Sequence, residues 1–355
     1  MKTIDVSTEQ APAVGAPADD AVLRVDDLRV TFTRGGREIR AVGGLSYTVR
    51  PSRMLAIIGE SGSGKSVSVR ALMGLLPPSA RVEGSARLGD IELVGRSDKA
   101  MRAIRGDDIS MVFQDPARSL NPTMSVGAQI VEAVRAHRAV SKKDAAARAV
   151  ELLTLVKLSA PERRFHEYPH QLSGGMRQRV MIAIALAADP RVLIADEATT
   201  ALDVTTQAQI MELLVDLQTR LGTAIIMISH DLGLAASYAD EVLVMYAGRA
   251  VEHAPSETLF GDVRMPYTAA LLGAIPQLTT PSHAQLTVIG GQPPDLSALP
   301  EGCAFRDRCP RATERCAERP PLTDEASPGH SFACWHPVDQ RGRDVASALN
   351  EEETP

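Results

Sequence analysis

The chain has 355 residues, more than one compact core usually holds, so we expect more than one domain. Its hydrophobic fraction of 44% is ordinary for a globular protein, and a net charge of −6 without a Lys/Arg block argues against a nucleic-acid partner. The longest apolar run, Val180 to Ala188, is far below the roughly 20 residues of a spanning helix, and the N-terminus shows no secretory signal.

The first segments of the chain predict a tail followed by strands. Residues 1–21 are rich in Ala, Pro and Asp without an apolar period, which is typical of a disordered tail. Residues 22–33 alternate apolar and polar side chains, and residues 41–49 resemble a strand, so we expect a half-solvated sheet. Phe32 in the first strand could stack on a nucleobase, although the pattern alone favours a core position.

A glycine-rich stretch at residues 59–66 reads Gly-x-x-x-x-Gly-Lys-Ser, the spacing of a phosphate-binding P-loop. The apolar run at 54–58 before it is typical of a buried strand. Apolar spacing after it predicts a helix to about Leu76, which Pro77 and Pro78 would stop. The stretch therefore lies between a strand and a helix start, where backbone N–H groups can hold an anion.

This P-loop predicts a nucleoside triphosphate site. Lys65 would add a positive charge for the β- and γ-phosphates, and Ser66 would offer its hydroxyl to Mg²⁺. The loop residues expected around the phosphates are Gly59, Ser61, Gly62, Ser63 and Gly64.

The middle of the chain changes from sheet to helix. Residues 82–94 read as further sheet with glycine turns, and residues 108–113 read as a short strand that runs into Gln114. Between about 115 and 180 the pattern becomes helical, with a capping box that begins at Ser141. We therefore expect a helical insertion in an α/β scaffold.

A second glycine motif, LSGGM, occupies residues 172–176 ahead of an apolar helix that should reach Ala188. Ser173 can cap this helix, and Gly174 and Gly175 let an anion approach the backbone closely. The motif predicts a second phosphate-binding helix start, with a plain helix cap as the alternative.

Polar side chains follow the next two predicted strands. Residues 192–195 run into Asp196 and Glu197, where one carboxylate can hold Mg²⁺ and the other can polarise a water. Residues 224–229 end at His230, at the strand end where open parallel sheets bind their ligands. Residues 205–221, between these strands, have the spacing of an amphipathic helix.

The P-loop, Gln114, LSGGM, Asp196-Glu197, Ala201-Leu202-Asp203 and His230 occur in this order, and the set resembles the ATP-binding-cassette (ABC) family over about residues 22–260. Longer stretches at 113–122 (FQDPARSLNP), 168–186 and 199–210 are similar to the ATPase subunits of bacterial di- and oligopeptide importers, a branch that also holds nickel importers. Residues 265–272 and 290–303 resemble the C-terminal extension of that branch.

The resemblance implies an α/β fold: a P-loop ABC cassette with a RecA-like core, an antiparallel β-subdomain and an inserted α-helical subdomain. The nucleotide-binding domain would occupy residues 22–261, with the helical part at about 115–180. Residues 262–340 would form a small Cys-rich extension, and residues 341–355 a flexible tail.

The resemblance also implies that two cassettes, more often a heterodimer than a homodimer, close head to tail over two ATP molecules. Lys65 and the loop amides would hold phosphates, Ser66 and Asp196 would hold Mg²⁺, and Gln114 would contact metal and water. Glu197 would be the general base, His230 would stabilise the γ-phosphate and Phe32 would stack on adenine. The remaining roles fall to Ser173, Gly174 and Gly175, which complete the partner's site, and to Asp203, which crosses the interface.

The function so implied is ATP hydrolysis that energises import of di- or oligopeptides. The expected partners are a second ABC ATPase subunit, two transmembrane permease subunits and an extracytoplasmic peptide-binding protein, with the chain at the cytoplasmic face of the membrane. Nickel import is the alternative within the branch. A non-transport ABC ATPase and a redox-sensing cassette are alternatives of another class.

All four cysteines lie near the C-terminus, at Cys303, Cys309, Cys316 and Cys334. Disulfides are disfavoured in a reducing cytoplasm, and zinc usually shows a tight Cys-x₂₋₄-Cys pair, which is absent. His330 and His336 keep zinc open as an alternative. An iron–sulfur cluster takes four thiolates, and the resemblance implies a 4Fe–4S cluster here.

Overall fold

The computed structural model describes residues 20–200, 202–274, 289–327 and 329–338. The tails expected at 1–21 and 341–355 therefore lie outside the described residues, apart from residues 20 and 21. Ala201 of the Ala201-Leu202-Asp203 motif lies outside them as well.

The N-terminal strands form a four-stranded antiparallel sheet in the order β2-β1-β4-β5. Leu23, Val25 and Val30 of β1 face the core and are at most 1% exposed, as the alternating pattern predicts. The bounds are Leu23–Arg34 for β1, Arg37–Val49 for β2, Ala80–Leu88 for β4 and Ile91–Glu92 for β5.

A second, eight-stranded sheet has the order β11-β12-β10-β9-β3-β8-β7-β6. Its strands β9, β3, β8, β7 and β6 are parallel, so their carboxyl ends lie along one edge of the sheet. The bounds are β3 Met54–Ile58, β6 Ile109–Val112, β7 Val192–Asp196, β8 Ala224–Ser229, β9 Glu241–Tyr246, β10 Arg249–Pro255, β11 Thr323–Ser327 and β12 His330–Phe332.

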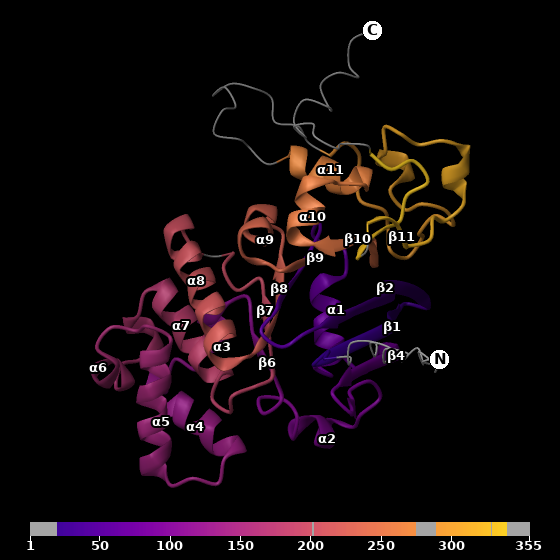
Figure 1. Ribbon diagram of the computed structural model, residues 1–355. Coiled ribbons are helices and arrows are strands. Elements are labelled where there is room, and N and C mark those ends of the chain that lie inside the picture. The colour runs from indigo at the N-terminus through magenta and orange to yellow at the C-terminus, as the bar shows by residue number, and fades with distance from the viewer. Residues whose placement is uncertain (1–19, 201, 275–288, 328, 339–355) are drawn as a thin grey trace, which may run out of the picture.

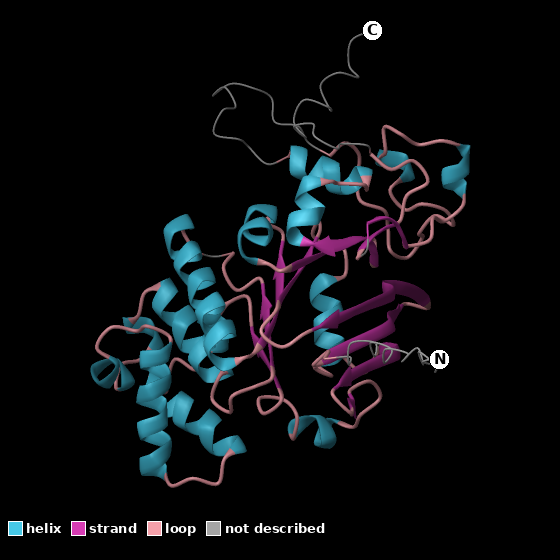
Figure 2. Cartoon of the chain, in the orientation of Figure 1, coloured by secondary structure: helices cyan, strands magenta, loops and turns pink. Residues whose placement is uncertain are grey.

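Helices lie on both sides of the parallel strands (Figures 1 and 2). Helices α3 to α8 are on one side, and α1 lies on the other side beside the four-stranded sheet. The bounds are α1 Lys65–Leu72, α2 Asp98–Arg102, α3 Pro116–Ser119, α4 Val126–His137, α5 Lys142–Leu155, α6 Pro161–Phe165, α7 Gly174–Ala185, α8 Val204–Leu221, α9 Leu232–Tyr238, α10 Ser256–Gly261 and α11 Pro266–Gly273. Short 3₁₀ turns cover Pro169–Gln171, Arg306–Arg308 and Glu314–Ala317.

Two helices end earlier than their apolar spacing predicts. Helix α1 ends at Leu72 instead of Leu76, because the chain turns at Gly74, whose φ is 59°. Helix α7 ends at Ala185 instead of Ala188, and Asp189 shortly afterwards has a φ of 56°. At the predicted capping box the N-cap is confirmed, since the Ser141 hydroxyl accepts a hydrogen bond from the Asp144 N–H at 3.2 Å; the Asp144 carboxylate in turn accepts from the Ser141 hydroxyl at 2.7 Å.

The central strand β3 is buried on both faces. Met54, Ala56 and Ile58 pack in one apolar cluster with helices α4, α5, α7 and α8. Leu55 and Ile57 point the other way and pack with α1 and the four-stranded sheet. The P-loop therefore leaves the sheet from a fully buried strand. Within the described ranges no helix combines the length and the apolar character needed to cross a bilayer.

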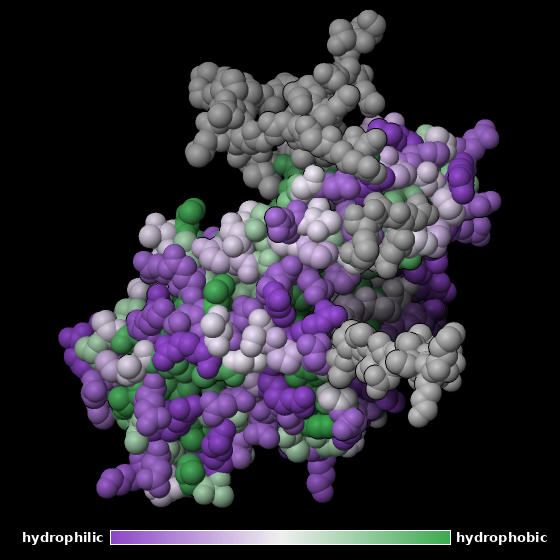
Figure 3. Space-filling model, viewed as in Figure 1, coloured by the Kyte–Doolittle hydropathy of each residue, from purple (hydrophilic) through white to green (hydrophobic). Residues whose placement is uncertain are grey.

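The C-terminal extension, by which we mean the described part of residues 262–338, joins the main sheet. Its strand β12 pairs antiparallel with β10, where Glu252 stands opposite Phe332. Tyr267 and Phe305 of the extension belong to the same apolar cluster as β3. Figure 3 shows a largely hydrophilic face, with hydrophobic patches over the helices at the lower left.

Candidate nucleotide site

The P-loop connects β3 to α1 through turns that require glycine. Gly59 has a φ of 147°, and a Cβ there would lie 2.2 Å from the carbonyl oxygen of Met245. Gly64 has a φ of 99°, and a Cβ there would lie 2.3 Å from the carbonyl oxygen of Ala41. Gly64 is the N-cap of α1 and provides no side-chain cap, so this helix start has the form of an anion site.

The serines of the P-loop differ in their surroundings. Ser61 and Gly62 are exposed at the tip of the loop. Ser63 is only 4% exposed, and its hydroxyl finds no hydrogen-bond partner among the described residues. A buried hydroxyl without a partner is costly unless a ligand satisfies it, and a phosphate oxygen at this loop would do so.

Lys65 lies inside the loop and is 4% exposed. Its ammonium donates to the carbonyl oxygens of Gly59 at 2.7 Å and Glu60 at 3.0 Å. Burial lowers the pKa of Lys65, and the carboxylates of Glu197, Asp196 and Glu60 oppose that shift. The ammonium thus lies beside the phosphate-binding turn with three acidic neighbours.

Asp196 ends β7 and is 1% exposed. One of its oxygens accepts a hydrogen bond from the Ser66 hydroxyl at 2.6 Å, and the other faces the Arg70 guanidinium at 3.1 Å. A hydroxyl and a carboxylate side by side fit Mg²⁺, which usually takes one or two carboxylates besides phosphate oxygens and waters. Arg70 is a member of the site that the sequence motifs gave no reason to single out.

Glu197 and Gln114 meet across two strand ends. The Gln114 amide donates to the Glu197 carboxylate at 2.7 Å. Glu197 has a φ of 50°, an unusual conformation for a residue with a side chain, and its N–H donates to the carbonyl oxygen of Ile228 at 3.1 Å. This backbone geometry fixes where the carboxylate leaves the sheet edge. His230 follows β8 at the same edge and is exposed.

The structure places the LSGG segment away from the P-loop. Ser173 is the N-cap of α7, and its hydroxyl accepts a hydrogen bond from the Met176 N–H at 3.3 Å. Ser173 and Gly174 are exposed, while Gly175 packs closely on Thr206 of α8. Figure 1 shows α7 and α1 on opposite sides of the parallel strands. Within one chain, therefore, the two glycine motifs do not form one site.

Asp203 caps the neighbouring helix α8. Its carboxylate accepts from the Thr206 N–H at 3.0 Å and from the Thr206 hydroxyl at 2.7 Å. The hydrogen bond from the Thr206 N–H is the main reason that the pKa of Asp203 lies below its usual range. The residue is exposed beside the LSGG segment.

Phe32 is half-buried in β1, opposite Ile39 of β2 and Ala80 of β4. Strand β2 also carries Ala41, the residue that Gly64 of the P-loop approaches. Phe32 thus lies one strand away from the strand that borders the P-loop, with part of its ring uncovered.

The four cysteines line one small cavity of the C-terminal extension, together with Phe305, Trp335 and His336. Burial raises the pKa of Cys303, Cys309 and Cys334, the last to about 12. Backbone N–H groups of Phe305, Arg311 and His336 counteract this by donating toward those sulfurs. In the described part of the chain, however, no three His, Cys, Asp or Glu side chains are close enough together to form a ready metal site. The four cysteines thus line one cavity without forming a ready metal site as they stand.

The two histidines considered as zinc ligands have other contacts. His330 is fully buried and pairs with the buried carboxylate of Glu252 at 2.9 Å. The His336 ring lies 2.7 Å from the Thr313 hydroxyl, and its backbone N–H donates to the Cys334 sulfur at 3.3 Å. His330 is therefore engaged in joining β12 to β10, a role that its position in the sequence does not indicate.

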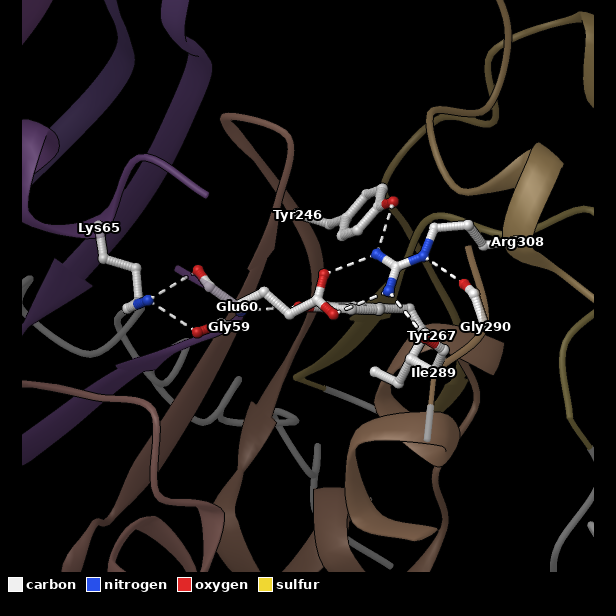
Figure 4. A network of polar contacts seen from close by, with 8 residues as sticks. All are labelled: Gly59, Glu60, Lys65, Tyr246, Tyr267, Ile289, Gly290 and Arg308. Atoms are coloured by element: carbon white, nitrogen blue, oxygen red, sulfur yellow. Dashed lines mark hydrogen bonds and ion pairs between the residues drawn. The ribbon is translucent and has the colours of Figure 1, made fainter. Parts of the chain in front are cut away.

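The sequence motifs did not predict one set of contacts that the P-loop makes. Glu60, inside the loop, is bound by Arg308 of the C-terminal extension and by Tyr267 of α11 (Figure 4). Arg308 is 248 residues away from Glu60 in the chain, and nothing in the spacing of either motif links them.

Comparison with known proteins agrees with this geometry. The family model "ABC transporter" matches residues 42–200, and the model "Oligopeptide/dipeptide transporter, C-terminal region" matches residues 251–316. Among solved structures, the chain is similar to a dimeric ATP-binding cassette in a post-hydrolysis state with ADP and Pi, at 29% identity and a TM-score of 0.59, over 66% of this chain and 98% of that one. It is also similar to cbiO1 of Clostridium perfringens, at 28% identity and a TM-score of 0.59, over 68% of this chain and 91% of that one.

Curated relatives cover nearly the whole chain. The oligopeptide transport ATP-binding protein OppD of Salmonella typhimurium is 47% identical over 94% of this chain and 98% of its own length. The dipeptide transport ATP-binding protein DppD of Bacillus subtilis is 47% identical over 89% of this chain and 95% of its own length. The predicted cassette fold and the predicted branch are thus confirmed. The chain belongs to the ABC-type ATPases that form the ATP-binding subunits of oligopeptide and dipeptide transporters.

Proposed function

We propose that this chain binds and hydrolyses ATP to energise the import of di- or oligopeptides through a membrane transporter. The main support is one sheet edge that gathers the P-loop Lys65, the Ser66–Asp196 pair and the Glu197–Gln114 pair. Relatives named for peptide transport over almost the whole chain support the cargo class.

The residues at this edge divide the chemistry between them. Lys65 and the loop amides would hold the phosphates, while the hydrogen-bonded Ser66–Asp196 pair, together with Gln114, would ligate Mg²⁺. Bound Mg²⁺ would neutralise charge on the β- and γ-phosphate oxygens. Glu197 would accept the proton of the attacking water, and His230 at the neighbouring strand end would stabilise the γ-phosphate.

A second cassette completes the site. Ser173, Gly174 and Gly175 lie away from the P-loop of their own chain, and Ser173 and Gly174 are exposed to another molecule. A head-to-tail dimer would bring the partner's helix start over the ATP held by this P-loop, with Asp203 at the interface. A heterodimer with a related cassette is the arrangement we propose.

The membrane partners are two permease subunits, with a peptide-binding protein on the far side and this chain at the cytoplasmic face. An apolar cleft of about 470 Å³ supports a permease contact. It is lined by Met111, Phe113, Leu120 and Met181, and Phe113 is 41% exposed directly before Gln114. A permease helix in this cleft would sense the position of Gln114, and so the state of the nucleotide.

Reconstitution tests the function directly. The chain, its partner cassette, the permease pair and the binding protein are placed in vesicles with ATP inside, and uptake of labelled peptide and of Ni²⁺ is compared. We expect ATP-dependent peptide uptake. Uptake of Ni²⁺ alone would favour the nickel importer, and ATPase activity without any permease partner would favour a non-transport or redox-sensing cassette.

We further propose that Cys303, Cys309, Cys316 and Cys334 hold a 4Fe–4S cluster, which would order an extension with little regular structure. Support comes from the four sulfurs around one cavity and the backbone N–H groups directed at three of them. Iron and acid-labile sulfide should be present after anaerobic purification and absent from Cys309→Ser. A colourless protein that carries zinc would contradict the proposal.

A further inference from the structure

All five N–H donors of the Arg308 guanidinium are engaged, and two of them bind the P-loop. The guanidinium forms two hydrogen bonds with the Glu60 carboxylate, at 2.7 and 2.9 Å. Its remaining N–H groups donate to the carbonyl oxygens of Gly290 at 2.8 Å and Ile289 at 3.3 Å, and to the Tyr246 hydroxyl at 3.2 Å (Figure 4). A guanidinium has five N–H donors, so this side chain is held in a single arrangement.

The surroundings of Arg308 exclude water. Its side chain is 5% exposed and that of Glu60 is 23% exposed. The guanidinium also lies 5.8 Å from the ring centre of Tyr246 and 5.9 Å from that of Phe305. The hydrogen bonds to Glu60 are the main reason that the pKa of Arg308 is raised above its usual value. This is therefore a desolvated, bidentate ion pair rather than a surface contact.

Tyr267 fixes the peptide that lies just before Glu60 in the loop. Its hydroxyl accepts a hydrogen bond from the Glu60 N–H at 2.8 Å, and the ring is fully buried. The carbonyl of the same planar peptide belongs to Gly59 and accepts the Lys65 ammonium at 2.7 Å. Since a trans peptide holds its N–H and C=O on opposite sides, fixing the N–H on Tyr267 also aims the carbonyl at Lys65.

We infer that Arg308 and Tyr267 are positioning residues of the ATP site, through which the C-terminal extension holds the P-loop in its binding conformation. The inference rests on the proposed function, because it takes ATP to be the ligand of the loop. A loop that is already ordered loses less freedom when it closes on a triphosphate, so the clamp raises the affinity for ATP.

The clamp also joins the cysteine cavity to the P-loop. Arg308 directly precedes Cys309, and both lie in one turn whose Cys309 N–H donates to the carbonyl oxygen of Arg306 at 3.2 Å. The Cys303 N–H donates to the carbonyl oxygen of Cys316 at 3.0 Å, which links two of the segments that carry the cysteines. Disorder at the cysteines would therefore loosen Arg308 and, through Glu60, the loop.

The test measures the Kd of a fluorescent Mg·ATP analogue, together with KM and kcat, on the full chain. Arg308→Gln should raise Kd and KM about tenfold. Arg308→Lys, which keeps the charge but loses the fork, should fall between it and the unchanged chain. Tyr267→Phe keeps the ring packing and should raise Kd without lowering the unfolding temperature of the nucleotide-free chain. Arg102→Gln, which breaks an exposed pair with Asp98, is the matched control and should leave Kd unchanged.

The outcomes separate the clamp from the proposed function. If the unchanged chain fails to bind Mg·ATP, the proposed function fails. If it binds Mg·ATP, and Arg308→Gln and Tyr267→Phe bind it equally well, the clamp is wrong. A lowered unfolding temperature for Arg308→Gln with an unchanged Kd would likewise contradict the inference, because the contact would then stabilise the fold without acting on ATP binding.

The link to the cysteines is tested by a double-mutant cycle. Cys309→Ser should raise the Kd for Mg·ATP in the unchanged chain but add little in the Arg308→Gln background, since the connection is already broken there. Fully additive effects would show that the cysteine cavity does not act on the loop through Arg308.

Discussion

Helices α1 and α7 both begin after glycine-rich turns, but the two helix starts differ in their capping and in the charged side chains around them. At α1 no side chain caps the helix, and a buried Lys65 and Asp196 stand ready beside it. At α7 the Ser173 hydroxyl caps the helix, and Ser173 and Gly174 are exposed. We call the first the assembled half of the site and the second, which we propose faces a partner cassette, the offered half.

The largest expected effect comes from removing the proposed general base, Glu197, from the assembled half. Glu197→Gln keeps the shape and the contact with Gln114 but cannot accept a proton, so hydrolysis should fall roughly 10²–10⁴-fold. Binding of Mg·ATP should persist. Phosphate release and nucleotide binding are measured on the same preparation, and hydrolysis at the unchanged rate would show that the chemistry lies elsewhere.

A smaller effect should follow from a change in the LSGG segment, which forms the offered half of the site. A Cβ on Gly174 meets the Leu202 side chain only at 3.4 Å, so the position accepts a side chain. Gly174→Asp would place a negative charge where the partner's γ-phosphate should lie, and hydrolysis should fall on the order of 10²-fold. Gly174→Ala is the control for size and should stay near the unchanged rate.

The same variant sharpens the comparison between the two halves. Binding of Mg·ATP to the single chain should not change in Gly174→Asp, because this motif lies away from the P-loop of its own chain. Weakened binding in the isolated chain would mean that α7 contributes to its own nucleotide site, contrary to the arrangement in Figure 1.

The smallest effect belongs to Phe32, the proposed base-stacking residue of the assembled half. Phe32→Leu should lower affinity for ATP about two- to twelvefold, since aromatic stacking contributes about 0.5–1.5 kcal/mol. Phe32→Tyr should bind almost as the unchanged chain does. Inorganic triphosphate has no base to stack, so its affinity should be the same in all of these proteins; an equal loss for triphosphate and ATP would make Phe32 a core residue.

The sequence was sufficient to predict those parts of the site that depend on residues close together in the chain. A buried strand before the P-loop, a carboxylate at the end of β7 and a helix start after Ser173 follow from apolar runs, glycines and capping residues a few positions apart. The parallel order of the strands then brings Gln114, Asp196 and Lys65 to one edge without further information.

Other features depend on contacts between distant segments. The Glu60–Arg308 pair and the Tyr267 hydrogen bond join a loop to the extension, and neither end has a local pattern that names its partner. His330 looked like a metal ligand by type, yet β12 places it against Glu252. The end of α1 was missed because Gly74 turns the chain before Pro77 and Pro78 are reached.

The pairing of β12 with β10 has a practical consequence for anyone who shortens this protein. A chain cut after Gly261 would leave the outer edge of β10 without a neighbour, and its backbone N–H and C=O groups would be open to strands of other molecules. It would also remove His330 and the backbone N–H groups of Arg264 and Met265, all of which bind the Glu252 carboxylate. Such a truncated cassette should be prone to aggregation, so a missing ATPase activity in it would reflect loss of folded protein before loss of chemistry.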